Sequence, residues 1–384
     1  MRRVSELAAK EEKLVLGLLS GTSADGIDAA LVRIRGCGLT TRVETMAYAT
    51  VPYPDRLREA ILRLSAGIGG AAEICRLNFE IGERFADAAI ALLARCDRKA
   101  DLAGSHGQTI CHLPRRMGEY GSTLQIGEAD VIAERLGIPV VSGFRTRDIA
   151  AGGEGAPLSA YMDYLLFRRE GRTRLLLNLG GIANVTVVAP AIEEVFAFDT
   201  GPANMPLDEC VRLLTDGAQQ FDRDGRMAAQ GRIDENLLRR LLEHPYLALP
   251  APKTTGRETF GRHFVEPYLR GKGTLRGVDV LATLTAFVAH SIHRAWRDHI
   301  APRADVREVV ASGGGVHNLA LLSHLRRLFG RVPVVTIAEE GIDPDAKEAL
   351  LFALLANETI HGIPNNMPGA TGARWPAVLG KVSP

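Results

Sequence analysis

An informative stretch near the N-terminus reads KLVLGLLSGTSADGIDAALVRI and occupies residues 13–34. Residues 14–19 form an apolar run that predicts a buried strand, and residues 27–34 predict a second strand with looser alternation. Residues 20–26 between them are rich in Gly, Ser, Thr and Asp, which favour a tight turn. The stretch therefore predicts a β-hairpin whose tip is polar and carries glycine.

A second stretch, TRLLLNLGGIANVTVVA at residues 173–189, has the same plan of strand, glycine-bearing tip and strand. The two stretches share few identical residues, so the pattern repeats rather than the sequence, and this indicates two related domains. Strands and helices alternate over the rest of the chain, which is typical of the α/β class. We expect domains at residues 13–160 and 161–384, with the boundary inside residues 150–172.

The composition is that of an ordinary globular protein. The 384 residues are 46% hydrophobic and 24% charged, which excludes a disordered chain and a fibrous one. Because 46 Lys and Arg nearly cancel 45 Asp and Glu, the net charge is +1, and nothing favours nucleic acid or a membrane surface as a partner. No apolar run reaches the ~18 residues that a membrane span needs.

The cysteines and the N-terminus bear on the compartment. Five scattered cysteines with no CxxC pair disfavour a disulfide framework and a structural zinc site, and favour a reducing cytosol. The start, MRRVSELAAKEEK, is charged and lacks the apolar centre of a secretory signal, although it can form a helical extension. We therefore expect a cytoplasmic protein.

Four glycine-rich tips are candidates for binding phosphate: SGTSADG at 20–26, LGGIAN at 179–184, SGGGVHN at 312–318 and NMPGATGA at 366–373. Exposed backbone N–H groups at such tips can cradle a phosphate, since glycine lets the backbone approach closely. One such tip is more often only a tight turn, but four in one chain favour a nucleotide site. No GxxxxGK[ST] occurs, and no GxGxxG follows the first strand, so a P-loop and a Rossmann site are disfavoured.

The segment FDTGPAN at residues 198–204 is the best candidate for the chemical centre. The apolar run at residues 195–198 should bring Asp199 to the end of a strand, where residues 200–202 then turn the chain. A carboxylate there can act as a general base or hold a magnesium-bound water. An aspartate that only stabilises a turn explains the spacing equally well.

Two further segments carry polar side chains. In GSHGQTICHLP, His106, Gln108 and His112 can bond a polyhydroxy ligand, although a loop histidine bonded to backbone is the commoner outcome, and the spacing is weak for zinc. In SGFRTRDIAAGGEGAPL, Arg145 and Arg147 lie near Asp148 and can either form an ion pair or bind an anionic group.

A glutamate near the C-terminus is the last candidate. Asp343 and Pro344 should start a helix that runs to about Ile360, with Asp343 as its N-cap. Glu348 falls in the first turns of this helix, next to Lys347. A surface ion pair is the usual fate of such a residue, but a role in the active site or near magnesium stays open.

Taken in order, the motifs resemble those of the anhydro-N-acetylmuramic acid kinase family, from about Lys13 to about Ala373. They are SGTSADGID, SHGQTICHLP, FRTRDIAAGGEGAPL, LNLGGIANVT, FDTGPAN, SGGGVHN and PNNMPGATGA. Each motif is modest alone, whereas the ordered set is specific. That family belongs to the sugar kinase/Hsp70/actin superfamily, and the fold that the resemblance implies is two ribonuclease H-like α/β domains around a cleft.

The resemblance implies an unusual reaction in peptidoglycan recycling. Water opens the C1–O6 bridge of 1,6-anhydro-N-acetylmuramic acid while O6 takes the γ-phosphoryl group of ATP, with Mg2+ on the phosphates. The products are N-acetylmuramic acid 6-phosphate and ADP, and the partners are small molecules only. The alternatives are a kinase for a different amino sugar or anhydro-hexose, and a non-catalytic ATP-binding switch like actin or Hsp70. The oligomeric state stays open, with a homodimer among the possibilities.

The resemblance also implies roles for particular residues. Asp199 would be the catalytic base and Glu348 a supporting active-site residue. The residues that would bind ATP are Gly21, Thr22, Ser23, Ala24, Asp25, Gly26, Ile27, Asp28, Gly180, Gly181, Asn184, Gly313, Gly314, Gly315 and Asn318. The residues that would face the sugar are His106, Gln108, Arg145, Asp148, Gly201 and Asn204. No protein ligand for a metal is assigned.

The chain departs from the family pattern at three positions. Ala203 stands where glycine is usual, Glu154 where glutamine is usual, and Ala24 where a larger apolar residue is common. None of these changes removes a charged catalytic group. Glu154 could alter contacts with the sugar. Of the expectations given above, the fine specificity for the sugar therefore depends most on this residue.

Overall fold

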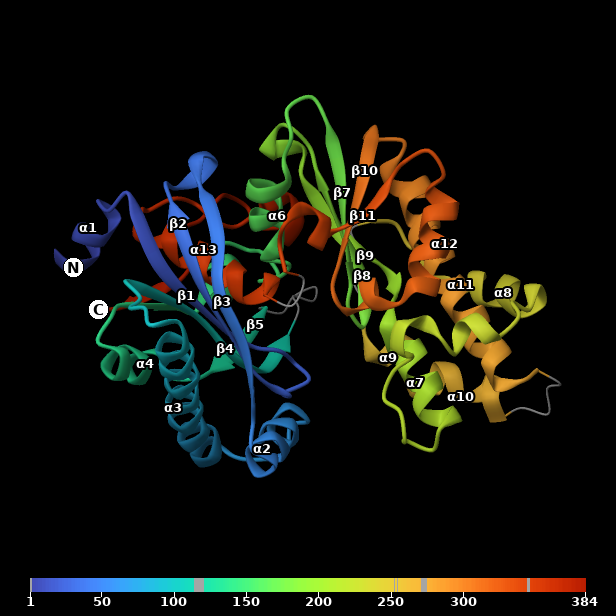
Figure 1. The fold of residues 1–384 in the computed structure, drawn as a ribbon, viewed down its shortest axis with the longest axis horizontal. Coiled ribbons are helices and arrows are strands. Elements are labelled where there is room, and N and C mark those ends of the chain that lie inside the picture. The colour runs from blue at the N-terminus through green and yellow to red at the C-terminus, as the bar shows by residue number, and fades with distance from the viewer. Residues whose placement is uncertain (1, 114–120, 252, 254, 271–274, 344–345) are drawn as a thin grey trace. The chain divides into compact units, whose positions relative to one another are not determined.

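The computed structural model describes every residue except 1, 114–120, 252, 254, 271–274 and 344–345. The chain forms two compact units (Figure 1): unit 1 comprises Met1–Leu166 and Ala346–Pro384, and unit 2 comprises Phe167–Asp345. The expected division placed residues 346–384 in the second domain, whereas they pack in unit 1. The reason is that the helix within them lies against the first hairpin, as shown below.

Unit 1 contains a mixed sheet with the order β12-β6-β4-β1-β2-β3, and β5 pairs with β4. The strands are β1 (Glu12–Ser20), β2 (Gly26–Arg35), β3 (Arg42–Pro52), β4 (Leu102–Leu113), β5 (Ser122–Ile126), β6 (Val140–Ser142) and β12 (Lys381–Ser383). β1 and β2 form the predicted antiparallel hairpin, and β4 runs parallel to β1. His106 and His112 were considered as loop histidines, but the SHGQTICHL segment is part of β4.

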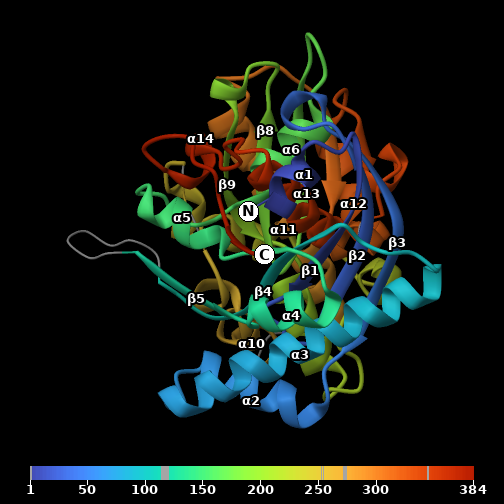
Figure 2. The ribbon, with the colours of Figure 1, turned by 90° about the vertical axis from the view of Figure 1, so that its left-hand side faces the viewer.

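Helices cover both faces of this sheet. They are α1 (Arg2–Ala8), α2 (Asp55–Ser65), α3 (Ala71–Cys96), α4 (Ala129–Leu136), α5 (Phe144–Ala150), α6 (Ser159–Phe167), α13 (Lys347–Ile360) and α14 (Pro368–Thr371). Figure 2 shows α2, α3 and α4 grouped together beside the sheet. Their buried side chains, such as Phe85 and Ile81, share a core with Leu16 and Leu18 of β1.

The opposite face of the unit 1 sheet receives α13. Gly17 of β1 and Gly104 of β4 are register partners, so they point to the same face. A Cβ atom at either position would overlap the backbone oxygen of Ala349 or of Phe352 in α13. Glycine at both positions therefore allows α13 to pack directly on the strands, and this packing holds the C-terminal segment in unit 1.

Unit 2 repeats the strand pattern. Its sheet has the order β11-β10-β7-β8-β9, in which β7, β8 and β9 are antiparallel and β10 is parallel to β7 and β11. The strands are β7 (Thr173–Leu179), β8 (Ile182–Val188), β9 (Phe196–Pro202), β10 (Val306–Ser312) and β11 (Val334–Thr336). The strands β3-β2-β1-β4-β6 of unit 1 have the same order and directions. The predicted pair of related α/β units is confirmed.

The helices of unit 2 enclose a large apolar core against this sheet. They are α7 (Asn204–Leu214), α8 (Glu235–Leu242), α9 (Arg257–Phe260), α10 (Arg262–Arg270), α11 (Gly277–Ala295) and α12 (Leu319–Phe329), with a 3-10 turn, η5, at Pro245–Ala248. The core joins Leu175, Leu177 and Val185 of the strands to Phe287 of α11 and Leu325 of α12.

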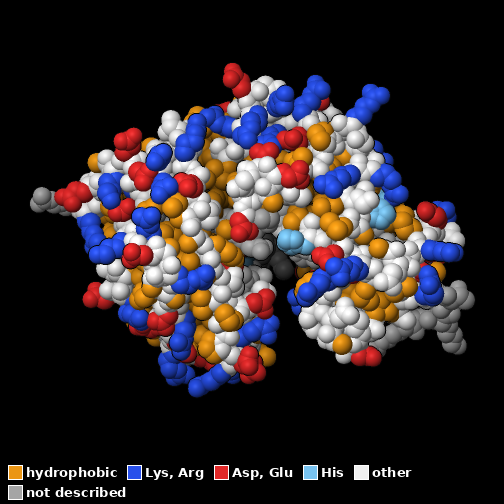
Figure 3. Space-filling view, viewed as in Figure 1, with side chains coloured by type: hydrophobic (Ala, Val, Ile, Leu, Met, Phe, Trp, Pro, Cys, Tyr) orange, Lys and Arg blue, Asp and Glu red, His pale blue; other side chains and the backbone are white. Residues whose placement is uncertain are grey.

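The surface carries charges of both signs. On the face in Figure 3, basic and acidic side chains are interspersed, with apolar side chains in small groups between them. Among the described helices, none has the length and apolar character needed to cross a membrane. All five cysteines are free thiols.

Candidate active site

The first glycine-rich tip joins β1 to β2 in unit 1. The backbone N–H of Ala24 donates to the carbonyl of Gly21 at 3.1 Å, which closes the turn. Gln108 of β4 is fully buried beside it: its amide nitrogen donates to the Gly21 carbonyl at 3.1 Å, and its amide oxygen accepts from the Ser20 hydroxyl at 2.5 Å. Gln108, which we expected to face the sugar, therefore braces the tip.

Asp28 lies just after this tip on β2. One oxygen of its carboxylate accepts hydrogen bonds from the Tyr48 hydroxyl at 2.8 Å and the Thr50 hydroxyl at 2.6 Å. Its negative charge also contributes to raising the pKa of Glu348, so the two carboxylates are close enough to interact. Two candidate residues from distant segments of the sequence therefore lie in one neighbourhood of unit 1.

Glu348 lies in the first turn of α13 and remains accessible to water. The surrounding protein partly desolvates its carboxyl, which raises the pKa, and the charge of Asp28 raises the pKa further. The charges of Lys347 and Arg145 lower it. Lys347 is buried and forms an ion pair with Asp163 of α6 at 2.9 Å, which fixes the start of the helix. The helix begins at Lys347 after Ala346, so Asp343 is not its N-cap, and Pro344 lies outside the described residues.

In unit 1, His106 is buried and pairs with Arg145, which is half-buried. Arg145 Nε donates to His106 Nε2 at 2.9 Å, and Arg145 Nη1 donates to the Gly155 carbonyl at 2.7 Å. Burial holds the pKa of His106 well below its usual value, and the charge of Arg145 adds to this, so the imidazole is neutral. Burial also lowers the pKa of Arg145 to about 10. The hydrogen bonds of the guanidinium go to neutral groups, while the charges of Glu348 and Asp148 act on it from nearby and raise its pKa.

Asp148 is completely buried and has a structural role. One carboxylate oxygen accepts from Asn366 Nδ2 and from the Thr371 hydroxyl, both at 2.8 Å, and the other accepts from the Gly155 N–H at 2.8 Å. The fourth glycine-rich segment contains α14 and ties down the arginine segment through this carboxylate. Asp148, which we expected to face the sugar, thus has its oxygens occupied by the protein.

In unit 2, three predicted segments come together. The N–H of Asn204 donates to the Gly180 carbonyl, and its side-chain amide donates to the Leu179 carbonyl, both at 2.9 Å. A Cβ atom on Gly315 would lie 2.6 Å from Leu179 Cβ and 3.1 Å from Asn204 Oδ1, and one on Gly313 would lie 2.9 Å from the Leu179 carbonyl. The LGGIAN, FDTGPAN and SGGGVHN segments are therefore in contact, and glycine permits the close approach.

Asp199 belongs to a polar row that crosses the sheet of unit 2. It is the register partner of Asn184 on β8, which pairs with Asn178 on β7. Partners on neighbouring strands point to the same face, so the three side chains form one row. Asp199 lies within β9 rather than at its end, because the strand continues to Pro202. Proline is tolerated there since β9 is an edge strand.

The environment of Asp199 suits a general base. Burial raises the pKa of its carboxyl to about 6, although a hydrogen bond from the Thr255 N–H to Oδ2 at 3.1 Å opposes this rise. A base works best when its pKa lies near the working pH. The sequence analysis missed Thr255 and its neighbours Lys253 and Tyr246, because no local motif marks a segment that reaches Asp199 from about 50 residues away.

Two other predicted residues have local structural roles. Asn318 is the N-cap of α12, and its Oδ1 accepts from the Leu321 N–H at 3.0 Å. Gly201 has a φ of +152° and packs near Ser291 of α11. Both residues are buried.

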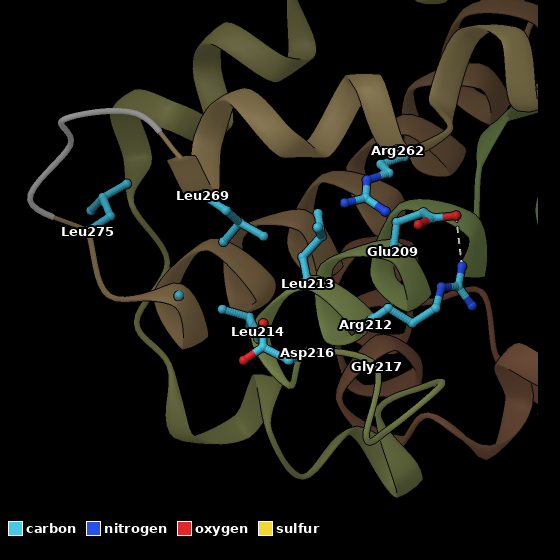
Figure 4. A pocket seen from close by; sticks show the side chains of 10 residues that line it. Glu209, Arg212, Leu213, Leu214, Asp216, Gly217, Arg262, Leu269 and Leu275 are labelled. Atoms are coloured by element: carbon cyan, nitrogen blue, oxygen red, sulfur yellow. Dashed lines mark ion pairs between the residues drawn. The ribbon is translucent and has the colours of Figure 1, made fainter.

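A hollow of about 620 Å3 lies elsewhere in unit 2. Figure 4 shows Arg212 and Glu209 of α7, paired at 2.9 Å, beside Leu213 and Leu214 of the same helix and Arg262 of α10. None of the predicted site residues lines it. Across the described ranges, no three His, Cys, Asp or Glu side chains converge as a metal centre would require.

Glycine-lined turns lie near carboxylates in both α/β units, and such turns are able to bind the phosphates of a nucleotide. Residues 13–384 match the family model for anhydro-N-acetylmuramic acid kinase. Curated members of that name are 46% identical in Caldanaerobacter subterraneus subsp. tengcongensis, with 100% of both chains covered, and 42% identical in Salinibacter ruber, with 98% of both covered. The chain belongs to the anhydro-N-acetylmuramic acid kinase family.

Solved structures with some likeness are more distant. One is component A of (R)-2-hydroxyglutaryl-CoA dehydratase from Acidaminococcus fermentans, with a TM-score of 0.45, 14% identity, and coverage of 92% of this chain and 100% of that one. Another is a ROK family glucokinase from Streptomyces griseus, with a TM-score of 0.37, 14% identity, and coverage of 89% and 98%. At these scores they do not bear on function.

Proposed function

We propose that the protein converts 1,6-anhydro-N-acetylmuramic acid, ATP and water to N-acetylmuramic acid 6-phosphate and ADP in the recycling of peptidoglycan. The observation that carries the proposal is the carboxylate of Asp199, whose pKa is raised and which lies beside Asn184 on one face of the unit 2 sheet. The choice of substrate and of phosphoryl transfer as the reaction rests on membership of the family.

Asp199 takes a proton from the attacking water in this scheme. The water oxygen bonds to C1 as the C1–O6 bond breaks, and the electron pair of that bond stays on O6. O6 then attacks the γ-phosphorus of ATP, and ADP leaves. No separate acid is needed at O6, because the phosphoryl group takes the place of a proton there.

ATP would bind through the glycine segments. In unit 1, the turn at residues 21–25 offers backbone N–H groups that can bind phosphate. Considered separately, unit 2 offers N–H groups of the same kind at Gly180–Gly181 and Gly313–Gly315. Mg2+ would be held mainly by phosphate oxygens, and it neutralises their charge when bound. Asp28 supplies a carboxylate of the kind that Mg2+ prefers, directly after the first turn.

Arg145 would bind the lactyl carboxylate that distinguishes muramic acid from other amino sugars. Both of its hydrogen bonds go to neutral groups, and a bound carboxylate would add to the negative charge that Glu348 and Asp148 already place near it. For Arg145→Met, we expect the KM of the sugar to rise at least ~10-fold and discrimination against an anhydro sugar without a lactyl group to vanish. Arg147→Met is the matched control, since Arg147 is exposed on the same helix.

The test of the proposed function is ADP release that depends on the anhydro sugar, measured with a panel of amino sugars and anhydro-hexoses. The proposal predicts turnover with the muramic acid derivative well above that with the others. Sugar-independent ADP release, or binding of ATP without turnover, would contradict it and favour a switch. We also expect action in the cytosol, and light scattering would test whether the enzyme is a homodimer.

A further inference from the structure

A segment of unit 2 holds Asp199 from the open side of its strand. β9 is the edge of the sheet, so the outward backbone groups of Asp199 have no neighbouring strand to bond. Instead, the N–H of Asp199 donates to the Lys253 carbonyl at 3.0 Å, and its carbonyl accepts from the Tyr246 hydroxyl at 2.8 Å. The Thr255 N–H binds the carboxylate at 3.1 Å.

From these contacts, we propose that Tyr246, Lys253 and Thr255 are positioning residues that fix the backbone and the carboxylate of Asp199 for proton abstraction. We name the three residues the Asp199 clamp. The proposal rests on the proposed function, because it takes Asp199 to be the base. It goes beyond that function by assigning a purpose to a segment that no motif marks.

Lys253 holds the clamp together. Its side chain is only 7% exposed, and its ammonium group donates to the carbonyls of Tyr246 at 3.2 Å and Leu247 at 3.3 Å. The ammonium also lies 4.8 Å from the centre of the Tyr246 ring. These contacts bind the two ends of the segment to each other, so the groups that hold Asp199 form one unit.

Burying an ammonium group costs desolvation free energy, even when carbonyl groups accept its hydrogen bonds. Burial lowers the pKa of Lys253, Arg294 lowers it further, and Asp298 raises it. The charge of Lys253 in turn contributes to lowering the pKa of His299. An apolar side chain would fill the space at a lower cost of desolvation. A fixed geometry at Asp199 gives a reason to keep the charge, since misplacement by about 1 Å can cost ~100-fold in rate.

The first test compares Tyr246→Phe and Lys253→Met with the unaltered enzyme. We expect kcat to fall about tenfold in each, with the KM of ATP·Mg within about twofold. The acid limb of kcat/KM should move to higher pH, because a looser bond from the Thr255 N–H stabilises the carboxylate less. Tyr268→Phe on α10 is the control, and it should leave all of these values unchanged.

The second test repeats Tyr246→Phe in an Asp199→Asn background. If the clamp acts through Asp199, the second change should add no further loss. Full kcat and an unshifted acid limb in both clamp variants, with Asp199→Asn inactive, would overturn the clamp and leave the proposed function intact. Near-normal turnover in Asp199→Asn would overturn the proposed function itself.

A merely structural role predicts a different pattern. In that case, the melting temperature of Tyr246→Phe would fall while kcat and the pH profile of the folded enzyme stayed normal. That result would also overturn the proposal. Tyr246→Phe removes a single oxygen, so it keeps the test decisive if Lys253→Met does not fold.

Discussion

The pH dependence of turnover follows from the surroundings of Asp199. A base must be ionised, and burial raises the pKa of this carboxyl to about 6. About nine-tenths of the enzyme is then active at pH 7 and about a tenth at pH 5, so kcat/KM should fall about tenfold between these values. The carboxylate form is lost as the pH falls, which places the limb on the acid side.

Asp199→Asn should remove this limb together with most of the activity. The amide keeps the shape and can still accept a hydrogen bond from the Thr255 N–H, but it cannot take a proton. We expect turnover to fall at least ~100-fold, with ATP·Mg and the sugar still binding.

Sugar-dependent ADP release from pH 5 to 8, with separate titrations of ATP·Mg and sugar against the folded variant, is the assay. If Asp199 instead ordered the nucleotide and its metal, Asn would weaken ATP·Mg binding and spare the chemical step. A flat profile between pH 5 and 7, or turnover within tenfold of normal in the Asn variant, would refute the reasoning.

Two other predictions concern glycines. Gly21→Val should weaken ATP binding at least ~10-fold, because the side chain crowds the backbone where phosphate would approach. The fold should keep its stability, since only Ser23 Oγ would lie within 4 Å of the new Cβ. Calorimetric titration with ATP·Mg checks the affinity, and an unchanged affinity would contradict the prediction. Gly17→Ala should destabilise the fold by about 3 kcal/mol or more, because its Cβ would overlap the Ala349 backbone. Gly70→Ala is the control, since its Cβ meets open space. Equal denaturation midpoints for the two variants would argue against this packing.

Local pattern was enough to predict the two hairpins and their tips. Apolar runs such as residues 14–19 and 175–177 must be buried, and the glycines between strands can adopt tight turns. The same logic failed for Asp199, since Gly201 and Pro202 have the composition of a turn. An edge strand accommodates both residues, and its position at the edge depends on the whole sheet.

Contacts between residues far apart in the chain could not be predicted from the sequence. Asp148 is bonded to Asn366 and Thr371, which are 218 and 223 residues away, and neither the spacing nor the composition of the segments marks the pairing. The packing of α13 in unit 1 depends likewise on the absence of side chains at Gly17 and Gly104. Asn184 and Asp199 lie on adjacent strands of one sheet, so the backbone pairing itself brings these two candidate residues together.

Product analysis in oxygen-18 water tests the coupling of hydrolysis to phosphoryl transfer most directly. We predict one heavy oxygen at C1 of the sugar, an unlabelled phosphate ester at O6, and one ADP for each bridge opened. Label in free phosphate, or a phosphorylated sugar whose anhydro bridge is intact, would contradict it.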